Sequence, residues 1–218
     1  SIPEIANVVG LFPMRSALVV LATNGIWVIR GSSSEGFSAT SYRVEKVTST
    51  GCVSRYSVCD VKGLPVWMGE DSIYTLEYDP NFNAFQLKSL SDERVRTYIK
   101  DIPASRKIYS KMQYDVTEQI LRILFYTASA IAGDRFYYNR ILNYDVNSKA
   151  WYPWEVALVD PIVGMVNVSD ANHVYPALLK FIFQSNGIEA SNKIYFGDFK
   201  PNATVFRDYE NFVDTYAT

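Results

Sequence analysis

The chain has 218 residues, of which 48% are hydrophobic and 20% charged, and this balance excludes an intrinsically disordered protein. Its formal net charge is -2 at pH 7. Domains that bind nucleic acid without sequence preference normally have a strongly positive net charge, so the composition does not favour that function. With a single His and 2 Cys, the chain has almost no ligands for a His/Cys metal site. The 16 Tyr and 12 Phe favour β-structure, because flat rings pack well on a pleated surface.

Short strands separated by turns are predicted in the first third of the chain. They cover residues 17–22, 26–29, 42–47, 57–61, 64–68 and 73–76. Asn24-Gly25 is expected to supply the positive φ angles of a tight hairpin, and Lys62-Gly63 predicts a second turn. The longest apolar runs fall far short of the roughly 20 residues that a membrane-spanning helix needs, so no membrane contact is expected.

Residues 91–102 break the β pattern and are predicted to form a short amphipathic helix. Ser91 is expected to be its N-cap, followed by acidic residues in the first turn. The apolar side chains that recur at helical spacing, and should pack the helix on a β body, are Val95, Tyr98, Ile99 and Ile102. Pro103 is expected to end the helix.

The second half of the chain returns to strands. They are predicted at residues 110–115, 121–127, 136–144, 150–156, 163–168, 177–184, 193–199 and 204–207. Turn residues separate them about every 8–12 residues, a spacing typical of sandwiches and propellers rather than of βαβ units.

An eight-residue pattern, Tyr-Asp-x-Asn-x-x-Ala-aromatic, occurs at residues 78–85 and again at 144–151. Each copy follows one apolar strand and precedes another, so each predicts a hairpin whose Asp and Asn side chains bond the backbone of the turn. The aromatic residue that opens the outgoing strand is expected to pack across onto the Tyr of the incoming strand.

Apolar-aromatic pairs also open strands at residues 26–27, 73–74 and 194–195, which divides the chain into about four units of roughly 50 residues. That period is typical of four-stranded propeller blades. We therefore predict an all-β, propeller-like fold with about four blade-like units and one short helix, with a β-sandwich as the alternative. Residues 1–218 are expected to form a single domain, cut from a longer chain, that is either a whole propeller or part of a larger ring. In such a fold, comparable positions in successive sheets should be occupied by Trp27, Tyr74, Trp151 and Tyr195.

Few residues offer catalytic chemistry. His173 is the only histidine and lies near Asp170, but its setting is a polar loop and the sequence has no Gly-x-Ser-x-Gly elbow, so we interpret it as a dispensable loop residue. Cys52 and Cys59 are expected to be reduced, partly buried thiols, because a disulfide scaffold needs more cysteines in a shorter chain.

A glycosidase needs two carboxylates in one cleft. The candidate acids are Glu70, Asp71, Asp208, Glu210 and Asp214. They fall in turns, where water solvates them, and the Ser-x-Asp-x-Gly-x-Thr-Trp boxes of propeller sialidases are absent. The sequence also lacks EF-hand loops, phosphate-cradling glycine loops and dinucleotide fingerprints. We therefore predict no catalytic, cofactor-binding or metal-binding residues.

Six basic residues cluster on and after the predicted helix: Arg94, Arg96, Lys100, Arg106, Lys107 and Lys111. Acidic neighbours dilute them, which favours a solvated face. The alternative is a local basic strip that faces nucleic acid inside a channel.

Several segments resemble tailed-phage structural proteins of the tail nozzle or tail tubular type. In that family an Arg-x-x-Leu-hydrophobic run leads to Thr or Glu, Asn, Gly or Ser, Ile or Val, Trp and then a glycine, and residues 13–31 resemble this pattern. The next matching segments, in order, are residues 51–54, 62–63, 69–74, 95–99, 144–151 and 208–216. The resemblance extends from about Pro13 to the end of the chain.

This resemblance implies a β-propeller platform in an oligomeric tail ring around a DNA channel, without enzyme activity. The implied partners are other tail or head-tail connector proteins, copies of the chain itself and, without specificity, the DNA in the channel. The implied location is the virion tail, after synthesis in the host cytoplasm. Members of the family are usually several hundred residues long, so the chain would be one portion of such a protein. The rival hypothesis is a carbohydrate-binding or carbohydrate-cleaving propeller, which would have a cleft lined by Trp or Tyr and two carboxylates within about 9.5 Å.

Overall fold

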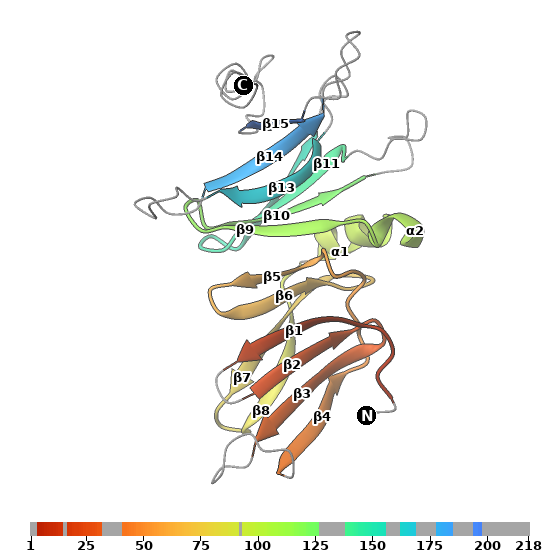
Figure 1. The fold of residues 1–218 in the computed structure, drawn as a ribbon, viewed down its shortest axis with the longest axis vertical. Coiled ribbons are helices and arrows are strands. Elements are labelled where there is room, and N and C mark those ends of the chain that lie inside the picture. Colours follow the sequence, from red (N-terminus) through yellow and green to blue (C-terminus); the bar gives the residue numbers. More distant parts are fainter. Residues whose placement is uncertain are drawn as a thin grey trace, which may run out of the picture. The chain divides into compact units, whose positions relative to one another are not determined.

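The computed structural model describes residues 4–14, 17–31, 41–91, 93–126, 138–155, 162–168, 178–184 and 194–197. Strands dominate these residues, with two short helices, so the chain is all-β (Figure 1). It divides into two compact units, residues 1–109 (unit 1) and residues 110–218 (unit 2). The assignment of residues 1–218 to a single domain stays a prediction.

Unit 1 contains two four-stranded antiparallel sheets. The first has the order β1 (Val8–Met14), β2 (Ala17–Ala22), β3 (Gly25–Gly31) and β4 (Tyr42–Thr48). The second has the order β5 (Val58–Val61), β6 (Leu64–Met68), β7 (Ile73–Asp79) and β8 (Ala84–Ser89).

Unit 2 repeats this plan. Its first sheet has four antiparallel strands: β9 (Lys111–Asp115), β10 (Ile120–Phe125), β11 (Arg140–Asp145) and β12 (Ala150–Glu155). Its second sheet has, among the described residues, β13 (Ile162–Val168), β14 (Leu178–Gln184) and β15 (Ile194–Gly197).

In every sheet the spatial order of the strands follows the chain. This is the meander of a propeller blade, whereas sandwich domains of the immunoglobulin type connect their strands as Greek keys. The prediction of an all-β fold built from four blade-like sheets is therefore confirmed.

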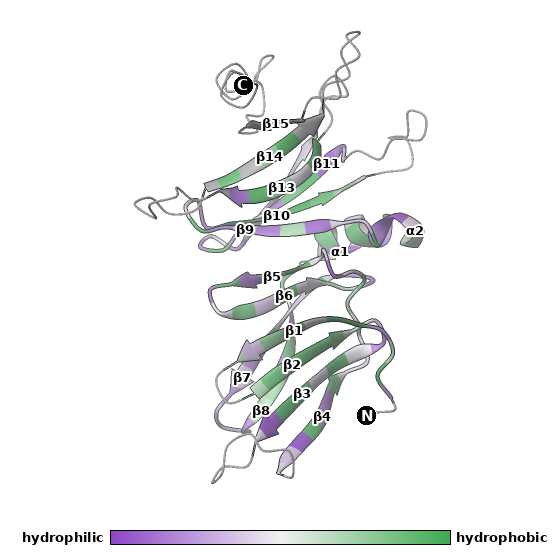
Figure 2. Cartoon of the chain, viewed as in Figure 1, coloured by the Kyte–Doolittle hydropathy of each residue, from purple (hydrophilic) through white to green (hydrophobic). Residues whose placement is uncertain are grey.

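The core of unit 1 lies between its two sheets. The first sheet contributes Val19, Leu21 and Ile26, and the second contributes Trp67 and Leu76, all fully buried. The central strand β2 is apolar throughout, as Figure 2 shows, because its residues are buried on both faces of the sheet. On the second face, Val20 and Ala22 pack with Trp27.

Among the described residues, the core of unit 2 again joins both of its sheets. Leu124 and Ile141 of the first sheet pack with Ile162 and Phe181 of the second. The phenol rings of Tyr126 and Tyr138 lie edge to face at 6.4 Å between centroids. Each unit therefore buries its own apolar faces.

The Tyr-Asp hairpins have the predicted ring contacts and the predicted bonds from the Asp side chains, whereas the predicted role of the Asn side chains stays a prediction. Tyr78 lies opposite Phe85 with ring centroids 5.3 Å apart, and Tyr144 lies opposite Trp151 at 4.6 Å. In the turns, the Asp79 carboxylate accepts from the Asn81 amide at 2.9 Å, and that of Asp145 accepts from the Asn147 amide at 2.8 Å. The last turn residue has a positive φ in both copies, 48° at Asn83 and 57° at Lys149.

A third copy of this hairpin, which the sequence pattern did not reveal, joins β9 to β10. Asp115 accepts from the Thr117 amide at 3.0 Å, Gln119 has a φ of 59°, and Tyr114 lies opposite Leu121. It lacks the Asn and the outgoing aromatic residue of the other copies. The carboxylate and the left-handed last residue are therefore sufficient for this turn.

Two helices replace the single predicted one. Helix α1 (Glu93–Lys100) buries Val95 and Ile99 as expected, with Ile102 buried just beyond it. Pro103 ends this segment but also starts a second helix, α2 (Ala104–Lys107). Proline is tolerated there because the first amide of a helix needs no partner inside it. We call residues 93–109 the helical connector.

Strand β1 was not predicted, because Gly10 and Pro13 interrupt its pattern. It lies at the edge of its sheet, where the missing proline amide disrupts no pairing. Gly10 follows an irregularity in its pairing with β2.

The predicted equivalence of four aromatic residues was wrong in one case. Trp27, Tyr74 and Tyr195 lie in the third strand of their sheets, but Trp151 lies in the fourth strand, β12. Trp151 instead corresponds to Phe85, since both open the strand after a Tyr-Asp turn. The expected positive φ at residues 24–25 is found at Gly25 alone, where a side chain would meet the Thr48 carbonyl. The predicted strand at residues 204–207 lies outside the described residues.

Candidate functional site

A pocket with a volume of about 810 Å³ lies at one end of unit 1. Its walls are the β2–β3 turn, the β4–β5 connection at residues 49–53, the β6–β7 turn and the helical connector. The first two walls are bound together closely, because the Cys52 amide donates to the Ala22 carbonyl at 2.9 Å. A Cβ on Gly51 would lie only 2.0 Å from the Thr23 carbonyl oxygen, so this approach requires glycine.

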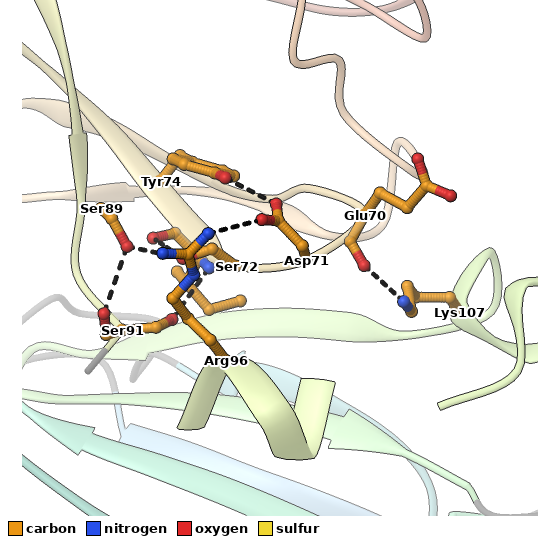
Figure 3. Close-up of polar contacts among 9 residues, drawn as sticks. Glu70, Asp71, Ser72, Tyr74, Ser89, Ser91, Arg96 and Lys107 are labelled. Atoms are coloured by element: carbon orange, nitrogen blue, oxygen red, sulfur yellow. Dashed lines mark hydrogen bonds and ion pairs between the residues drawn. The ribbon is translucent and has the colours of Figure 1, made fainter. Parts of the chain in front are cut away.

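Asp71, in the β6–β7 turn, is the centre of a polar network beside the pocket (Figure 3). Its carboxylate accepts from the Tyr74 hydroxyl at 2.6 Å and forms an ion pair with Arg96 at 2.8 Å. The Tyr74 hydrogen bond is the main factor that holds the pKa of Asp71 below its ordinary value, and Arg96 adds to it. Burial and the Asp71 carboxylate raise the pKa of Tyr74 to about 12.

Lys107, the last residue of α2, is 96% buried, with a relative exposure of only 4%. Its Nζ donates to the backbone carbonyl of Glu70, as Figure 3 shows. Burial lowers the pKa of Lys107, while the charges of Glu70 and Asp71 act in the opposite direction. The ammonium therefore attaches the end of the connector to the same turn that Arg96 binds from α1.

Three serines attach the start of the connector to the second sheet. The hydroxyls of Ser72 and Ser89 lie 2.6 Å apart, and Ser89 also donates to the Ser91 carbonyl at 3.2 Å. Ser91, the predicted N-cap, accepts a hydrogen bond from the Ile73 amide of β7 at 3.0 Å. The connector is thus bound to the β6–β7 turn and to β7 at its start, middle and end.

This arrangement stabilises the fold and is poorly suited to acid–base catalysis. A glycosidase needs one acid with a raised pKa beside an ionised one. Asp71 has the opposite property, and Glu70, its only acidic neighbour in the lining, has an exposed side chain. The described lining contains no Trp, Tyr or Phe, the side chains on which sugars stack.

Of the predicted acids, the described part of the chain contains Glu70 and Asp71, which are neighbours in the sequence. The remaining candidates lie outside the described residues: Asp170, His173, Asp208, Glu210 and Asp214.

The predicted basic stretch does not form one solvated face. Arg96 and Lys100 have exposed side chains, as that interpretation expects, although Arg96 is in an ion pair. Arg106 is half-buried and Lys107 is buried. Lys111 belongs to unit 2, where its Nζ donates to the Val163 carbonyl at 3.3 Å and lies over the Tyr138 ring. The side chain of Arg94 is outside the described part of the structure.

Sequence reasoning missed a buried arginine in unit 2. Arg122, in the middle of β10, donates to the Asn143 side chain at 3.0 Å and forms ion pairs with Asp115 and Glu118. Its guanidinium lies 5.0 Å from the centre of the Trp154 ring. The sequence does contain a signal for this buried arginine: it lies inside an otherwise apolar strand, and acids precede it by four and seven residues. Its charge is compensated within the unit, which indicates a structural role.

Both cysteines are free thiols, buried at Cys52 and half-buried at Cys59. Among the described residues, no three His, Cys, Asp or Glu side chains lie close enough to hold a metal ion. None of the helices in the described ranges is long and apolar enough to cross a membrane. No protein-family model and no curated protein matches the chain.

Proposed function

We propose that the chain is a non-enzymatic structural component of a phage tail, of the nozzle or tubular type, and acts through protein–protein contacts in an oligomeric assembly. The observation that carries this proposal is where the exposed large hydrophobic side chains lie. Val8 and Leu11 are exposed on the edge strand β1, Tyr42 on the edge strand β4, and Phe82 at the β7–β8 turn.

These positions suit assembly. Edge strands offer unpaired backbone groups to another chain, and natural proteins usually protect them with charges or proline. Here exposed apolar side chains occupy both edges of the first sheet, although Pro13 interrupts one of them. Aromatic side chains are enriched in the cores of protein interfaces.

The pocket supports the same proposal by its lack of catalytic chemistry. Asp71 is held ionised by Tyr74 and Arg96, and Lys107 holds a backbone carbonyl, so these polar groups stabilise the fold. A carbohydrate-active propeller would instead need an aromatic cleft and an acid with a raised pKa.

The partners we propose are other tail or head-tail connector proteins and further copies of the chain, in the virion tail, after synthesis in the host cytoplasm. Contact with DNA in the channel would be non-specific, since the net charge of -2 provides little general attraction for phosphate.

Mass spectrometry of phage particles, purified by density gradient from the source of this sequence, tests the proposal. Peptides of this chain should be enriched with the particles in a constant ratio to the portal protein. Their loss from particles with intact tails would contradict a structural role. A glycan array and a polysaccharide-cleavage screen on the purified chain test the carbohydrate alternative, which predicts binding or cleavage.

A further inference from the structure

The β2–β3 turn contains an Asn-Gly pair whose glycine the fold requires. Gly25 has a φ of 153°, and a Cβ there would lie 2.7 Å from the Thr48 carbonyl oxygen, so a side chain does not fit. An asparagine before glycine is chemically labile, because no Cβ hinders the approach of the glycine nitrogen to the asparagine side-chain carbon. The hairpin therefore cannot exchange the residue that makes Asn24 reactive.

Residues 4–7, which we call the covering segment, hold the Asn24 side chain at both of its polar atoms. The Asn24 Nδ2 donates to the Glu4 carbonyl at 2.7 Å, and the Ala6 amide donates to the Asn24 Oδ1 at 3.0 Å. Both partners are backbone groups, so their positions depend on the path of the covering segment rather than on its side chains. The amide group that a reaction at Asn24 would remove is thus bound by a segment about 20 residues away in the chain.

Two further contacts attach the covering segment to the first sheet. The Thr23 amide donates to the Asn7 carbonyl at 3.0 Å, and Ile5 packs on the buried cluster that contains Trp27. All of these contacts join residues of unit 1 to one another, so they are independent of where unit 2 lies.

We infer that Asn24 is a latent deamidation site, which the covering segment keeps unreactive until that segment opens. In the reaction the Gly25 nitrogen bonds to the Asn24 Cγ, and Nδ2 leaves as ammonia with the proton of the Gly25 amide. Water then opens the cyclic imide to aspartate or isoaspartate. The closed segment opposes the attack, because Nδ2 is bound to Glu4 while Gly25 is fixed in the β2–β3 ladder opposite Ala22.

The reaction would make the opening permanent. A carboxylate has no N–H to donate to the Glu4 carbonyl, so two oxygens would face each other where a hydrogen bond now lies. Isoaspartate also lengthens the backbone of a turn that joins two paired strands. Opening followed by deamidation therefore releases residues 4–7 irreversibly. This inference does not depend on the proposed tail role.

Peptide mass spectrometry of the full chain, incubated at mildly alkaline pH, measures the rate of conversion at Asn24. The native parent should react far more slowly than the parent unfolded in guanidinium chloride. Ala6→Pro removes the amide that binds Oδ1 and should speed the native reaction about 5-fold or more, as expected when one hydrogen bond no longer opposes local opening. Ala6→Gly keeps that amide and should react like the parent. The other Asn-Gly pair, Asn186-Gly187, lies outside the described residues and is the internal reference, whose rate Ala6→Pro should not change.

Asn24→Asp imitates the product and leaves the backbone of the covering segment unaltered, so it tests the same contacts if Ala6→Pro does not fold. Hydrogen exchange of peptides from residues 4–8 should become faster in this variant, while exchange in the β2–β3 ladder stays as in the parent. Unchanged exchange in residues 4–8 would overturn the inference. So would a native parent that deamidates at Asn24 as fast as the unfolded chain, or a folded Ala6→Pro variant that reacts as slowly as the parent.

Discussion

The packing of the helical connector leads to a quantitative prediction. Ile99 of α1 is 1% exposed, whereas Ile108, the residue after α2, is 46% exposed. Ile99→Ala removes three buried carbon atoms and leaves a cavity, which should lower the free energy of unfolding by about 2–5 kcal/mol. Ile99→Val removes one carbon and should cost about 0.5–1.5 kcal/mol. Ile108→Ala is the matched control, and about 1 kcal/mol or less is expected because that side chain already contacts water.

Urea unfolding of the parent and the three variants, followed by circular dichroism, gives these differences from the midpoints if the slope is unchanged. Hydrogen exchange of peptides from residues 93–102 then shows whether the connector opens before the rest of unit 1. The reasoning about the connector is refuted if Ile99→Ala costs no more than Ile108→Ala.

Three further predictions concern the β6–β7 turn and its neighbours. The lowered pKa of Asp71 contributes stability at neutral pH that is lost as the pH falls below about 4, so Asp71→Asn should make acid unfolding less steep. The pKa of Tyr74 is raised to about 12, so the stability that it contributes is present below pH about 10 and is lost as the pH rises toward 12, and Tyr74→Phe should reduce that loss in alkaline unfolding curves. Gly51→Ala would place a Cβ 2.0 Å from the Thr23 carbonyl oxygen and should lower stability by about 1–3 kcal/mol in thermal unfolding, whereas Gly10→Ala, whose Cβ would meet only a side chain at ordinary distance, should change it by about 0.5 kcal/mol or less.

The local features of the fold were predictable from the sequence. The Tyr-Asp pattern predicted both the turn bonds of Asp79 and Asp145 and the ring contacts across each hairpin, because these interactions form between residues close in the chain. The helical spacing of Val95 and Ile99 predicted which face of α1 is buried. Strand β1 was missed because its glycine and proline are tolerated only at a sheet edge, a position that the sequence does not reveal.

The polar network at the pocket was not predictable. Arg96 is 25 residues from Asp71, and Lys107 is 37 residues from Glu70, and only the folding of the connector onto the β6–β7 turn brings them together. The sequence placed the buried Lys107 in a solvated basic face, because its spacing carries no sign of burial. For Arg122, the nearby acids Asp115 and Glu118 were a signal in the sequence, but its partner Asn143, on the neighbouring strand, was not predictable.

Immunogold electron microscopy tests the central claim most directly. Antibodies raised against this chain would be applied to phage particles from the source of the sequence, with pre-immune serum as the control. The proposed role predicts gold particles on the tail, in the same place on every labelled virion. Labelling of the capsid alone, or no labelling of particles that the antibody can reach, would contradict a structural role in the tail.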